Sequence, residues 1–271
     1  MGAPLCYDKR KRKRRRTVNQ ERRNQIVELI REKQLVKNSE LMERFGISIE
    51  TVRRDLQYLE EQGFLERVYG GAVLKTFINM EPSYADRELV SGREKQAIAA
   101  EAQKLIFPRD TVFFDLGTTV KLVAQLLEKG KPVTAFTNSL RTALILSENE
   151  GCEVIITGGR LRAKELSVAG PLSEENMRRF NVEKAIIGVA GITEEGITDF
   201  IIDEASLRRQ VIRNASQVIV LADHSKFGIK AACNICGLEA IDVLITDEKA
   251  PQELLDHIRE RGVRVIITKT E

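Results

Sequence analysis

The last two thirds of the chain alternate short segments rich in β-branched residues with amphipathic helical patterns, and this alternation restricts the possible folds most. Strands separated by helices pair in parallel, and their sheet carries helices on its faces. We therefore predict an α/β domain built on a largely parallel sheet. The predicted strands are residues 111–115, 133–137, 153–157, 184–189, 217–222, 242–246 and 263–267, and the predicted helices include 119–128, 140–147, 204–214 and 252–261.

Polar loops follow the first three predicted strands and the fifth. In an open parallel sheet, ligands bind beyond the carboxyl ends of the strands, where loops lead into helices. Unpaired backbone N–H groups and the helix dipole favour an anion there. The loops therefore predict one site for a small, phosphorylated, hydroxyl-rich ligand, to which Lys226 adds a cation. They read Asp115-Leu116-Gly117-Thr118-Thr119, Thr137-Asn138-Ser139, Thr157-Gly158-Gly159-Arg160 and Ala222-Asp223-His224-Ser225-Lys226-Phe227-Gly228.

Other roles are open for these loops. Short polar loops before helices commonly serve only as helix caps. Asp115 and Asp223, at strand ends, would be general bases if the site were catalytic. They would accept hydrogen bonds from sugar hydroxyls if the site only binds. The loop residues alone leave these alternatives open.

The front of the chain is basic, although the whole chain is nearly neutral. Residues 1–75 carry 18 Lys and Arg against 11 Asp and Glu, whereas the remaining residues have a net charge of −4. A basic excess confined to one region indicates affinity for a polyanion such as nucleic acid. Eight of these bases, Lys9 to Arg16, are consecutive. They form an arm that would lie along DNA phosphates or serve as a solubilising tail.

Three short helical segments follow this arm. Apolar residues recur at helical spacing within residues 20–33, again after Asn38, and a third time after Ser48, which suits a helix N-cap. Gly46 separates the second segment from the third, and Gly63 ends the third. Two helices around a tight glycine turn indicate a helix-turn-helix.

The third helical segment, residues 49–62, has an apolar side and a basic side. Its helical periodicity places Arg54 opposite the apolar residues, with Arg53 beside it. We expect this basic side to enter the major groove of DNA as a recognition helix. Solvated surface arginines are the alternative. The apolar side carries Val52, Leu56 and Leu59.

Two short strand patterns around a glycine turn follow at residues 64–73 and predict a wing. Arg67 and the backbone of the glycine turn would contact phosphates beside the groove. Such contacts fix the orientation of a protein on DNA without reading the sequence. The predicted DNA contacts are Ser48, Thr51, Arg53, Arg54, Arg67, Gly70 and Gly71.

These patterns divide the chain into four parts. A length of 271 residues accommodates two domains. We expect a basic arm at 1–18, a winged helix-turn-helix domain at 19–75, a linker at 76–94, and the ligand-binding α/β domain at 95–271.

The sequence gives no sign of export or of a metal centre. No apolar run approaches the ~18 residues of a membrane-spanning helix, and the first thirty residues hold a run of bases in place of an apolar signal. Cysteines are too few for a disulfide scaffold, and Cys233 and Cys236 form a lone C-x-x-C pair without further ligands at suitable spacing. We expect a cytoplasmic protein without membrane contact, metal or cofactor.

Two sets of motifs resemble the DeoR family of bacterial transcriptional regulators, over about residues 20–268. One set lies in the helix-turn-helix and wing, and the other lies in the α/β domain, both in the family's order. The first set is Glu40-Leu41, Phe45-Gly46-Ile47-Ser48, Thr51-Val52-Arg53-Arg54-Asp55-Leu56, Leu59-Glu60, Gly63, Leu65 and Arg67-Val68-Tyr69-Gly70-Gly71-Ala72. The second set is Lys95, Ile98-Ala99, Asp115-Leu116-Gly117-Thr118-Thr119, Thr137-Asn138-Ser139, Gly158-Gly159, Gly170, Gly196-Ile197-Thr198, Glu204 and Ala222-Asp223-His224-Ser225-Lys226-Phe227-Gly228.

The resemblance implies a winged helix-turn-helix joined to a Rossmann-like sensor domain related to ribose-5-phosphate isomerase and glucosamine-6-phosphate deaminase. It also implies a phosphorylated sugar as the effector. Leu116 departs from the family, which often has serine there, and the basic arm is not part of the usual pattern. The implied effector-site residues are Asp115, Gly117, Thr118, Thr119, Thr137, Asn138, Ser139, Gly158, Gly159 and Lys226.

The resulting hypothesis is a transcriptional repressor of a carbohydrate-utilisation operon that a phosphorylated sugar releases from its operator DNA. Two-fold association would present two recognition helices to a palindromic operator, so we expect a homodimer or a higher homo-oligomer. A sugar-phosphate isomerase or deaminase with a DNA-binding arm is the alternative from another class, since a fold does not confer a function. A transcriptional activator that uses the same contacts is the third hypothesis.

Overall fold

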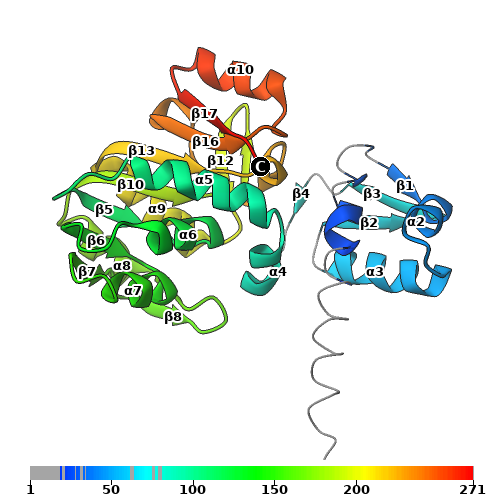
Figure 1. Ribbon diagram of the computed structural model, residues 1–271, viewed down its shortest axis with the longest axis horizontal. Helices are drawn as coiled ribbons and strands as arrows, with labels where there is room; N and C mark the ends of the chain where they lie inside the picture. Colours follow the sequence, from blue (N-terminus) through cyan, green and yellow to red (C-terminus); the bar gives the residue numbers. More distant parts are fainter. Residues whose placement is uncertain are drawn as a thin grey trace, which may run out of the picture. The chain divides into compact units, whose positions relative to one another are not determined.

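The computed structural model describes residues 19, 22–27, 29–30, 33, 35–61, 64–74, 77–78 and 81–270. The chain divides into two compact units, residues 1–76 and 77–271 (Figure 1). The predicted arm, with its basic run Lys9 to Arg16, lies outside the described residues.

The first unit combines helices with a small antiparallel sheet. Helices α2 (Asn38–Phe45) and α3 (Ile49–Glu61) accompany strands β1 (Leu35–Lys37), β2 (Leu65–Val68) and β3 (Gly71–Leu74), which pair in the order β1-β3-β2. Gly46 ends α2 with a φ of 60°, a left-handed conformation that glycine adopts without strain. The helix-turn-helix and the two wing strands are present as predicted. Strand β1 is a third strand that the sequence patterns did not indicate.

The core of this unit joins the helical residues before β1 to α2, α3 and the sheet. The residues before β1 contribute apolar side chains at the predicted helical spacing, and α3 turns its predicted apolar side to the same core. The buried members are Ile26, Val27, Leu29, Ile30, Val36, Leu41, Val52, Leu56, Leu59, Leu65 and Ala72.

The second unit is built on seven parallel strands, and all seven lie where strands were predicted. Their order is β17-β16-β13-β10-β5-β6-β7, so the chain reverses its direction across the sheet between β5 and β10. The α/β fold class is thereby confirmed. The strands are β5 (Thr111–Phe114), β6 (Val133–Thr137), β7 (Cys152–Ile156), β10 (Val182–Gly188), β13 (Ala215–Leu221), β16 (Val243–Asp247) and β17 (Arg264–Thr268).

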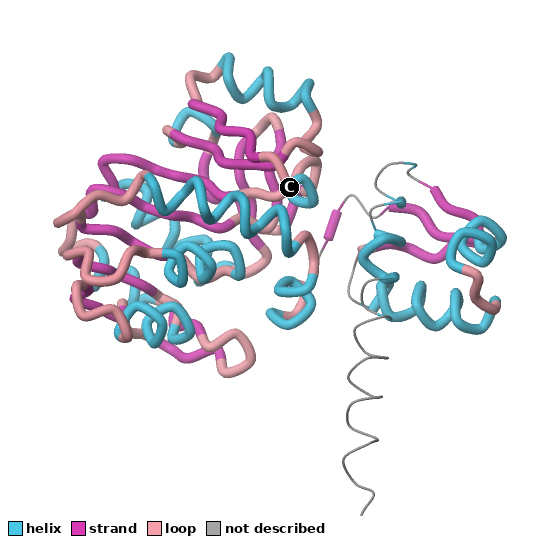
Figure 2. The backbone as a smooth tube through the Cα atoms, in the orientation of Figure 1, coloured by secondary structure: helices cyan, strands magenta, loops and turns pink. Residues whose placement is uncertain are grey.

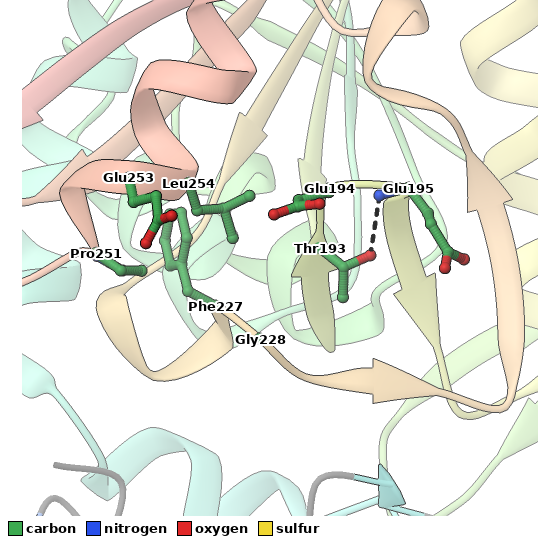
Figure 3. Close-up of a pocket in the computed structure, with 8 residues that line it drawn as sticks. All are labelled: Thr193, Glu194, Glu195, Phe227, Gly228, Pro251, Glu253 and Leu254. Atoms are coloured by element: carbon green, nitrogen blue, oxygen red, sulfur yellow. Dashed lines mark hydrogen bonds between the residues drawn. The ribbon is translucent and has the colours of Figure 1, made fainter.

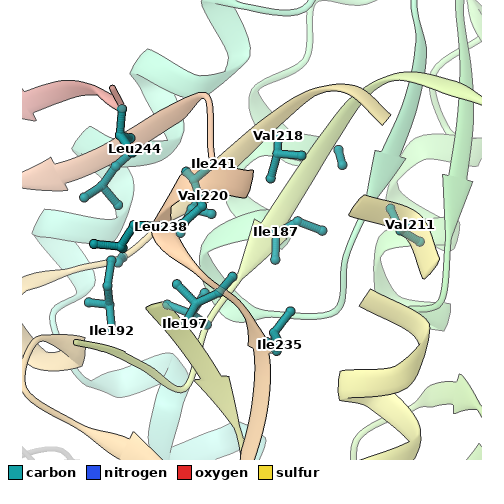
Figure 4. Packing of buried hydrophobic residues seen from close by; sticks show 14 of the residues in the cluster. Ile187, Ile192, Ile197, Val211, Val218, Val220, Ile235, Leu238, Ile241 and Leu244 are labelled. Atoms are coloured by element: carbon teal, nitrogen blue, oxygen red, sulfur yellow. The ribbon is translucent and has the colours of Figure 1, made fainter. Parts of the chain in front are cut away.

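Helices cover both faces of this sheet, and Figure 2 shows the helices around the strands. Helices α5, α6 and α7 pack on one face. Helices α8, α9 and α10 pack on the other, where Figure 4 shows part of the cluster around Ile187 and Val220. The helices are α5 (Gly92–Lys104), α6 (Thr118–Leu126), α7 (Leu140–Ser147), α8 (Pro171–Met177), α9 (Ile202–Asn214) and α10 (Gln252–Glu260).

Residues 77–94, predicted as a linker, carry structure that is counted with the second unit. Strand β4 (Phe77–Ile78) pairs in parallel with β14 (Lys230–Ala231). Helix α4 (Tyr84–Leu89) follows, and the Ser83 hydroxyl oxygen accepts the backbone N–H of Asp86 at 3.3 Å as its N-cap. Ion pairs from Arg87 and Glu88, and a hydrogen bond from Lys95, tie α4 to the rest of this unit.

Smaller strands lie outside the main sheet. Strands β8 (Arg160–Arg162) and β9 (Ser167–Ala169) form a hairpin, and β11 (Gly191–Thr193), β12 (Gly196–Asp199) and β15 (Cys233–Cys236) form an antiparallel sheet. Strand β15 holds the C-x-x-C pair, and burial raises the pKa of Cys236 to about 12, so its thiol stays protonated at neutral pH.

Within the described part of the chain, no group of three or more His, Cys, Asp or Glu side chains is placed to hold a metal ion. None of the described helices combines the length and the apolar character needed to cross a membrane.

Candidate DNA-binding face and effector site

Helix α3 presents Arg53 and Arg54 to solvent and buries its three predicted apolar residues. The predicted division of this helix into an apolar and a basic side is therefore confirmed. The Ser48 hydroxyl oxygen precedes the helix, accepts the backbone N–H of Thr51 at 3.4 Å, and lies 3.2 Å from the Thr51 hydroxyl. These four residues lie at the N-terminal half of α3, the part of a recognition helix that meets base edges.

Asp55 is the residue of α3 whose role the sequence patterns missed. Its side chain is 2% exposed. The Arg22 Nε donates to one carboxylate oxygen at 2.7 Å, the Arg23 Nε donates to the other at 2.7 Å, and the Arg23 guanidinium lies 3.8 Å from the centre of the Tyr58 ring. Removal of one partner would leave a buried charge uncompensated, so these pairs fix α3 against the preceding helical residues. No local pattern marks them, because the partners lie 32 and 33 positions away.

The wing gives its predicted contact residues different roles. Tyr69 and Gly70 form the exposed turn between β2 and β3, where Gly70 has a φ of 82°. Gly71 is buried, and a Cβ atom there would lie 2.0 Å from the carbonyl oxygen of Val36 in β1. The Arg67 Nε donates to a Glu60 carboxylate oxygen at 2.6 Å, so this side chain is tied to the end of α3. Gly71 thus has a packing reason to be glycine.

In the second unit, the carboxyl ends of β5 and β6 bring two predicted loops together. Strand β5 lies between β6 and β10, where the strand order reverses, and open α/β sheets bind ligands at such a switch point. One loop leads into α6, which Gly117 precedes, and the other leads into α7, so both offer helix N-termini to an anion. The buried polar side chains of these loops are Asp115, Thr118, Thr119, Thr137, Asn138 and Ser139.

Asp115 is fully engaged inside the protein. One carboxylate oxygen accepts the Leu116 N–H at 2.8 Å and the Asn138 amide at 3.4 Å, and the other accepts the Gly188 N–H at 3.2 Å and the Arg208 Nε at 2.6 Å. Burial raises the pKa of Asp115, although Arg208 opposes the shift. Arg208 in α9 also pairs with Asp199. Sequence reasoning missed Arg208, which lies 93 positions from Asp115.

The loop after β6 and the first turn of α7 contain buried polar atoms without a hydrogen-bond partner among the described residues. The Ser139 hydroxyl oxygen caps α7 by accepting the Thr142 N–H at 3.2 Å. The Asn138 side-chain oxygen and the Thr142 hydroxyl are buried and have no hydrogen-bond partner among the described residues. Buried polar groups are normally paired, so these two atoms are candidates for ligand contacts.

The third predicted loop differs from the expectation. Residues 157–159 lead into strand β8, not into a helix, so the expected helix N-terminus directly after this loop is wrong. The chain turns into the β8–β9 hairpin at the sheet edge and reaches α8 only at Pro171. Gly158 and Gly159 have φ of 73° and 114°, and a Cβ atom on Gly159 would lie 2.3 Å from the Ser173 hydroxyl. Both glycines therefore have a conformational role beside α8.

The Lys226 loop contains a buried acid between two lysines. Asp223 is 1% exposed and caps the short helix η1 (His224–Lys226), while its Oδ2 has no hydrogen-bond partner in the described structure. Burial works to raise the pKa of Asp223, but Lys226 and Lys95 hold it well below its usual range. Burial lowers the pKa of Lys95 to about 7, although Asp223 opposes this. Lys95, which no local motif marks as a ligand, thus joins the same edge of the sheet.

A cavity beside the Lys226 loop suits an anion poorly. It has a volume of about 450 Å³, and Phe227 and Gly228 of that loop line it together with Thr193, Pro251 and Leu254. Figure 3 shows that Glu194, Glu195 and Glu253 also line this cavity. Their negative charges would repel a phosphate. The strand-end loops are therefore the better candidate for an effector site.

Comparison with known proteins identifies the family. Residues 91–248 match the family model of the DeoR C terminal sensor domain, and residues 22–76 match that of the DeoR-like helix-turn-helix domain. The chain belongs to the DeoR family. One DeoR-family relative, the HTH-type transcriptional repressor GlcR of Bacillus subtilis (strain 168), is 35% identical over 252 residues, which cover 93% of this chain and 97% of GlcR. The glycerol-3-phosphate regulon repressor of Escherichia coli (strain K12) is 33% identical over 242 residues, which cover 88% of this chain and 96% of that repressor.

These DeoR-family relatives are named as transcriptional repressors and not as enzymes, which confirms the expectation of a regulator. Among solved structures, ribose 5-phosphate isomerase A of Methanocaldococcus jannaschii is similar with a TM-score of 0.36 and 19% identity, over 49% of this chain and 53% of the isomerase. A likeness this slight supports no statement about function.

Proposed function

We propose that this DeoR-family chain is a repressor that binds operator DNA through α3 and the wing and that a phosphorylated sugar releases it. The effector binds at the carboxyl ends of β5, β6 and β13. The observation that carries the proposal is the gathering of helix N-termini, partner-free polar atoms and two lysines at the switch point of the sheet.

The first unit supports the DNA-binding half of this proposal. Arg53 and Arg54 lie in solvent on a helix that Asp55 and the core fix in place. An arginine that binds guanine with both guanidinium nitrogens contributes roughly 1–3 kcal/mol of discrimination between bases. The wing, with Arg67 and the Gly70 turn, holds the DNA backbone, while Gly71 serves the packing of β3.

The second unit supports the effector half. Lys95 and Lys226 supply cations, and the N-termini of α6 and α7 supply backbone donors for a phosphate. The partner-free oxygens of Asn138 and Asp223 suit sugar hydroxyls. The relative named glycerol-3-phosphate regulon repressor is likewise named after a small phosphate ester.

The geometry does not favour the enzyme alternative. A general base needs an oxygen that is directed at the substrate, and both oxygens of Asp115 already accept two hydrogen bonds each. Asp223 has a pKa well below its usual range, because Lys226 and Lys95 outweigh its burial, and so it is a weak base. Incubation with pentose and hexosamine phosphates should therefore give binding without turnover.

Selection from a random duplex library tests the DNA-binding half. The full-length chain should enrich a palindromic sequence, because a two-fold dimer presents two copies of α3. Light scattering at the same protein concentration should report a dimer or a larger homo-oligomer. No sequence enrichment at any salt concentration would remove the assignment of α3.

Titration of the selected complex with sugar phosphates tests the effector half. At least one phosphorylated sugar should dissociate the operator complex, and the same sugar without its phosphate should not. Thermal shift of the free chain should rank the same ligands, because a ligand that binds the folded state raises its melting temperature. A panel without any active phosphate ester would contradict the proposal.

A further inference from the structure

Residues 81–90 cover the N-terminus of α6 at the proposed effector site. Their helix α4 is the first helix after the DNA-binding unit in the sequence. The backbone carbonyl of Arg87 in α4 accepts a hydrogen bond from the Lys95 ammonium. The same carbonyl oxygen lies 3.5 Å from the hydroxyl of Thr118, the first residue of α6. Glu88, the next residue of α4, pairs with Lys121 of α6.

The aromatic residue of α4 reaches the second effector loop. The Arg141 guanidinium, at the start of α7, lies 4.4 Å from the centre of the Tyr84 ring. Tyr84 is 6% exposed, and its hydroxyl has no hydrogen-bond partner within the described structure. Burial raises the pKa of Tyr84 to about 12, so this hydroxyl is a neutral donor. Helix α4 thus contacts both loops of the proposed effector site.

Ion pairs hold these residues in place. The Arg87 guanidinium contacts Glu81 at 3.2 Å and also contacts Glu165, which lies in the β8–β9 hairpin. Arg162 of β8 contacts the same Glu81 and also Glu204 of α9. The hairpin in turn touches the second effector loop, where the N–H of residue 140 donates to the carbonyl of residue 166 at 2.8 Å. The cluster therefore adjoins the predicted ligand contacts.

This cluster holds three acids against two bases. The side chains of Glu81, Glu165 and Glu204 are 9%, 7% and 1% exposed. Burial and the nearby Glu81 raise the pKa of Glu204 to about 7, although Arg162 opposes the shift. A phosphate dianion would add further negative charge, so it enters only by replacing a carboxylate. Guanidinium groups bind phosphate and carboxylate through the same paired hydrogen bonds, which makes the exchange possible.

We propose that residues 81–90 form a lid on the effector site and that the phosphate of the effector opens it by taking Arg87 and Arg162 from Glu81 and Glu165. This inference rests on the proposed function, because it assigns a regulation to the same site. In the closed lid, carboxylates of the chain itself occupy the phosphate position. In the open lid, α4 loses its ionic contact with the hairpin.

The lid lies at the start of the second unit, close in sequence to the end of the first. Strand β4 enters the second unit three residues before Glu81, and its partner β14 follows four residues after Lys226. A ligand changes DNA affinity only when it binds two arrangements of such an element differently. We assign operator binding to the closed lid and release to the open lid.

The variant Glu165→Gln tests the exchange of partners. It keeps the size of the side chain and removes a carboxylate that holds Arg87, so inorganic phosphate should bind about 5-fold more tightly, the lower end of usual coupling. The control Glu101→Gln removes the same charge from an exposed pair with Lys104 on α5 and should leave phosphate affinity unchanged. Isothermal titration of the full-length chains measures both. Equal phosphate affinity of Glu165→Gln and the wild type overturns the lid.

Hydrogen exchange of the wild-type chain gives a second test that does not depend on the folding of a variant. In α4, the N–H of Arg87 donates to Ser83, and the N–H of Val90 donates to Asp86. Saturating inorganic phosphate should speed amide exchange in residues 84–90 and slow it in residues 117–119. Slower exchange in residues 84–90 would overturn the lid.

The outcomes separate this inference from the proposed function. If neither inorganic phosphate nor any sugar phosphate binds the wild type, both fail together. If phosphate binds while residues 84–90 exchange no faster and Glu165→Gln has wild-type affinity, the effector site stands and only the lid fails.

Discussion

The two units handle charge in opposite ways. In the first, one buried acid, Asp55, is held between two arginines, while Arg53 and Arg54 lie in solvent. In the second, the arginines near the proposed effector site are buried or partly buried and have acidic partners, as Arg208 has Asp115 and Arg87 has Glu165. Exposed cations suit a long polyanion that releases its counterions on binding. Buried cations with exchangeable partners suit a single small anion.

This difference separates the variables to which each unit should respond. Salt screens exposed charges strongly and buried charges weakly, so operator binding should weaken steeply as salt rises. Effector binding should respond more to pH, because Lys95 has a pKa of about 7 as a result of its burial. Changes at Asp55, Arg54, Lys95 and Arg67 test this contrast.

The largest expected effect is on stability, from Asp55→Ala. The change leaves Arg22 and Arg23 without their shared carboxylate, and loss of a buried partner typically costs about 3–5 kcal/mol. Denaturant unfolding of the full-length chain should show this loss in the transition of the first unit. Glu50→Ala, on the exposed side of the same helix, is the matched control and should change stability little. A loss below about 1 kcal/mol would show that the pairs contribute little.

The next effect is on DNA binding, from Arg54→Ala. Operator affinity should fall by about 10- to 100-fold, which corresponds to roughly 1–3 kcal/mol, at unchanged stability. Gel-shift titration measures the loss, and Arg259→Ala, an exposed arginine of α10, is the control. Wild-type operator affinity in Arg54→Ala would remove the residue from the interface.

The same titrations sharpen the role of Arg54. If it binds a base, the variant should lose selectivity among operators while the salt dependence keeps its slope. If it binds a phosphate, affinity should fall uniformly and the slope of log K against log salt should decrease by about 1.

A smaller effect is expected from pH through Lys95. The Lys95 side chain is mostly the neutral amine above pH 7, since burial lowers its pKa to about 7. A phosphate dianion favours the charged form, so binding takes up a proton. Affinity should then fall by up to about tenfold per pH unit above the pKa. Isothermal titration of an active sugar phosphate between about pH 7 and 9, where the ester stays dianionic, measures this.

The control for the pH effect is Lys95→Gln, which should flatten the profile. The other charged groups facing Lys95 are Asp223, Lys226, Arg87 and Glu94. A profile that stays steep in Lys95→Gln would contradict the assignment and point to a different titrating group, such as Glu204.

The smallest effect is expected from Arg67→Ala. The Arg67–Glu60 pair is partly exposed, so its loss should cost less than about 1 kcal/mol of stability. Operator affinity should weaken equally for all sequences, because a backbone contact carries no base information. Comparison of two operators by gel shift tests this. A loss confined to one operator would mean that the wing reads bases.

The sheet could be predicted because its physics is local. Strands inside the sheet are buried on both faces and must be largely apolar, so they stand out from the polar loops around them, and the two edge strands β7 and β17 keep enough apolar residues to follow the same pattern. The loops after β5 and β6 followed from the strand ends. Strand β1 was missed because it has only three residues and depends on pairing with β3, 34 to 38 positions away in sequence.

The charged partners could not be predicted because they are distant in sequence. Arg87 and Glu165 are separated by 78 positions, and Arg208 and Asp115 by 93, and no periodicity connects such pairs. The prediction that a helix starts directly after residues 157–159 was wrong for a related reason. The glycines of this loop suit a helix start and a hairpin start equally, and only the packing against α8 decides between them.

Helix α3 keeps its scaffolding and its exposed arginines on separate sides. Because Arg53 and Arg54 lie in solvent, they can be exchanged without disturbing the interior of the unit. A regulator of this kind can acquire a new target promoter through a few substitutions and keep its fold. Under the proposed function, duplicated copies can then come to govern different genes while they answer to the same effector.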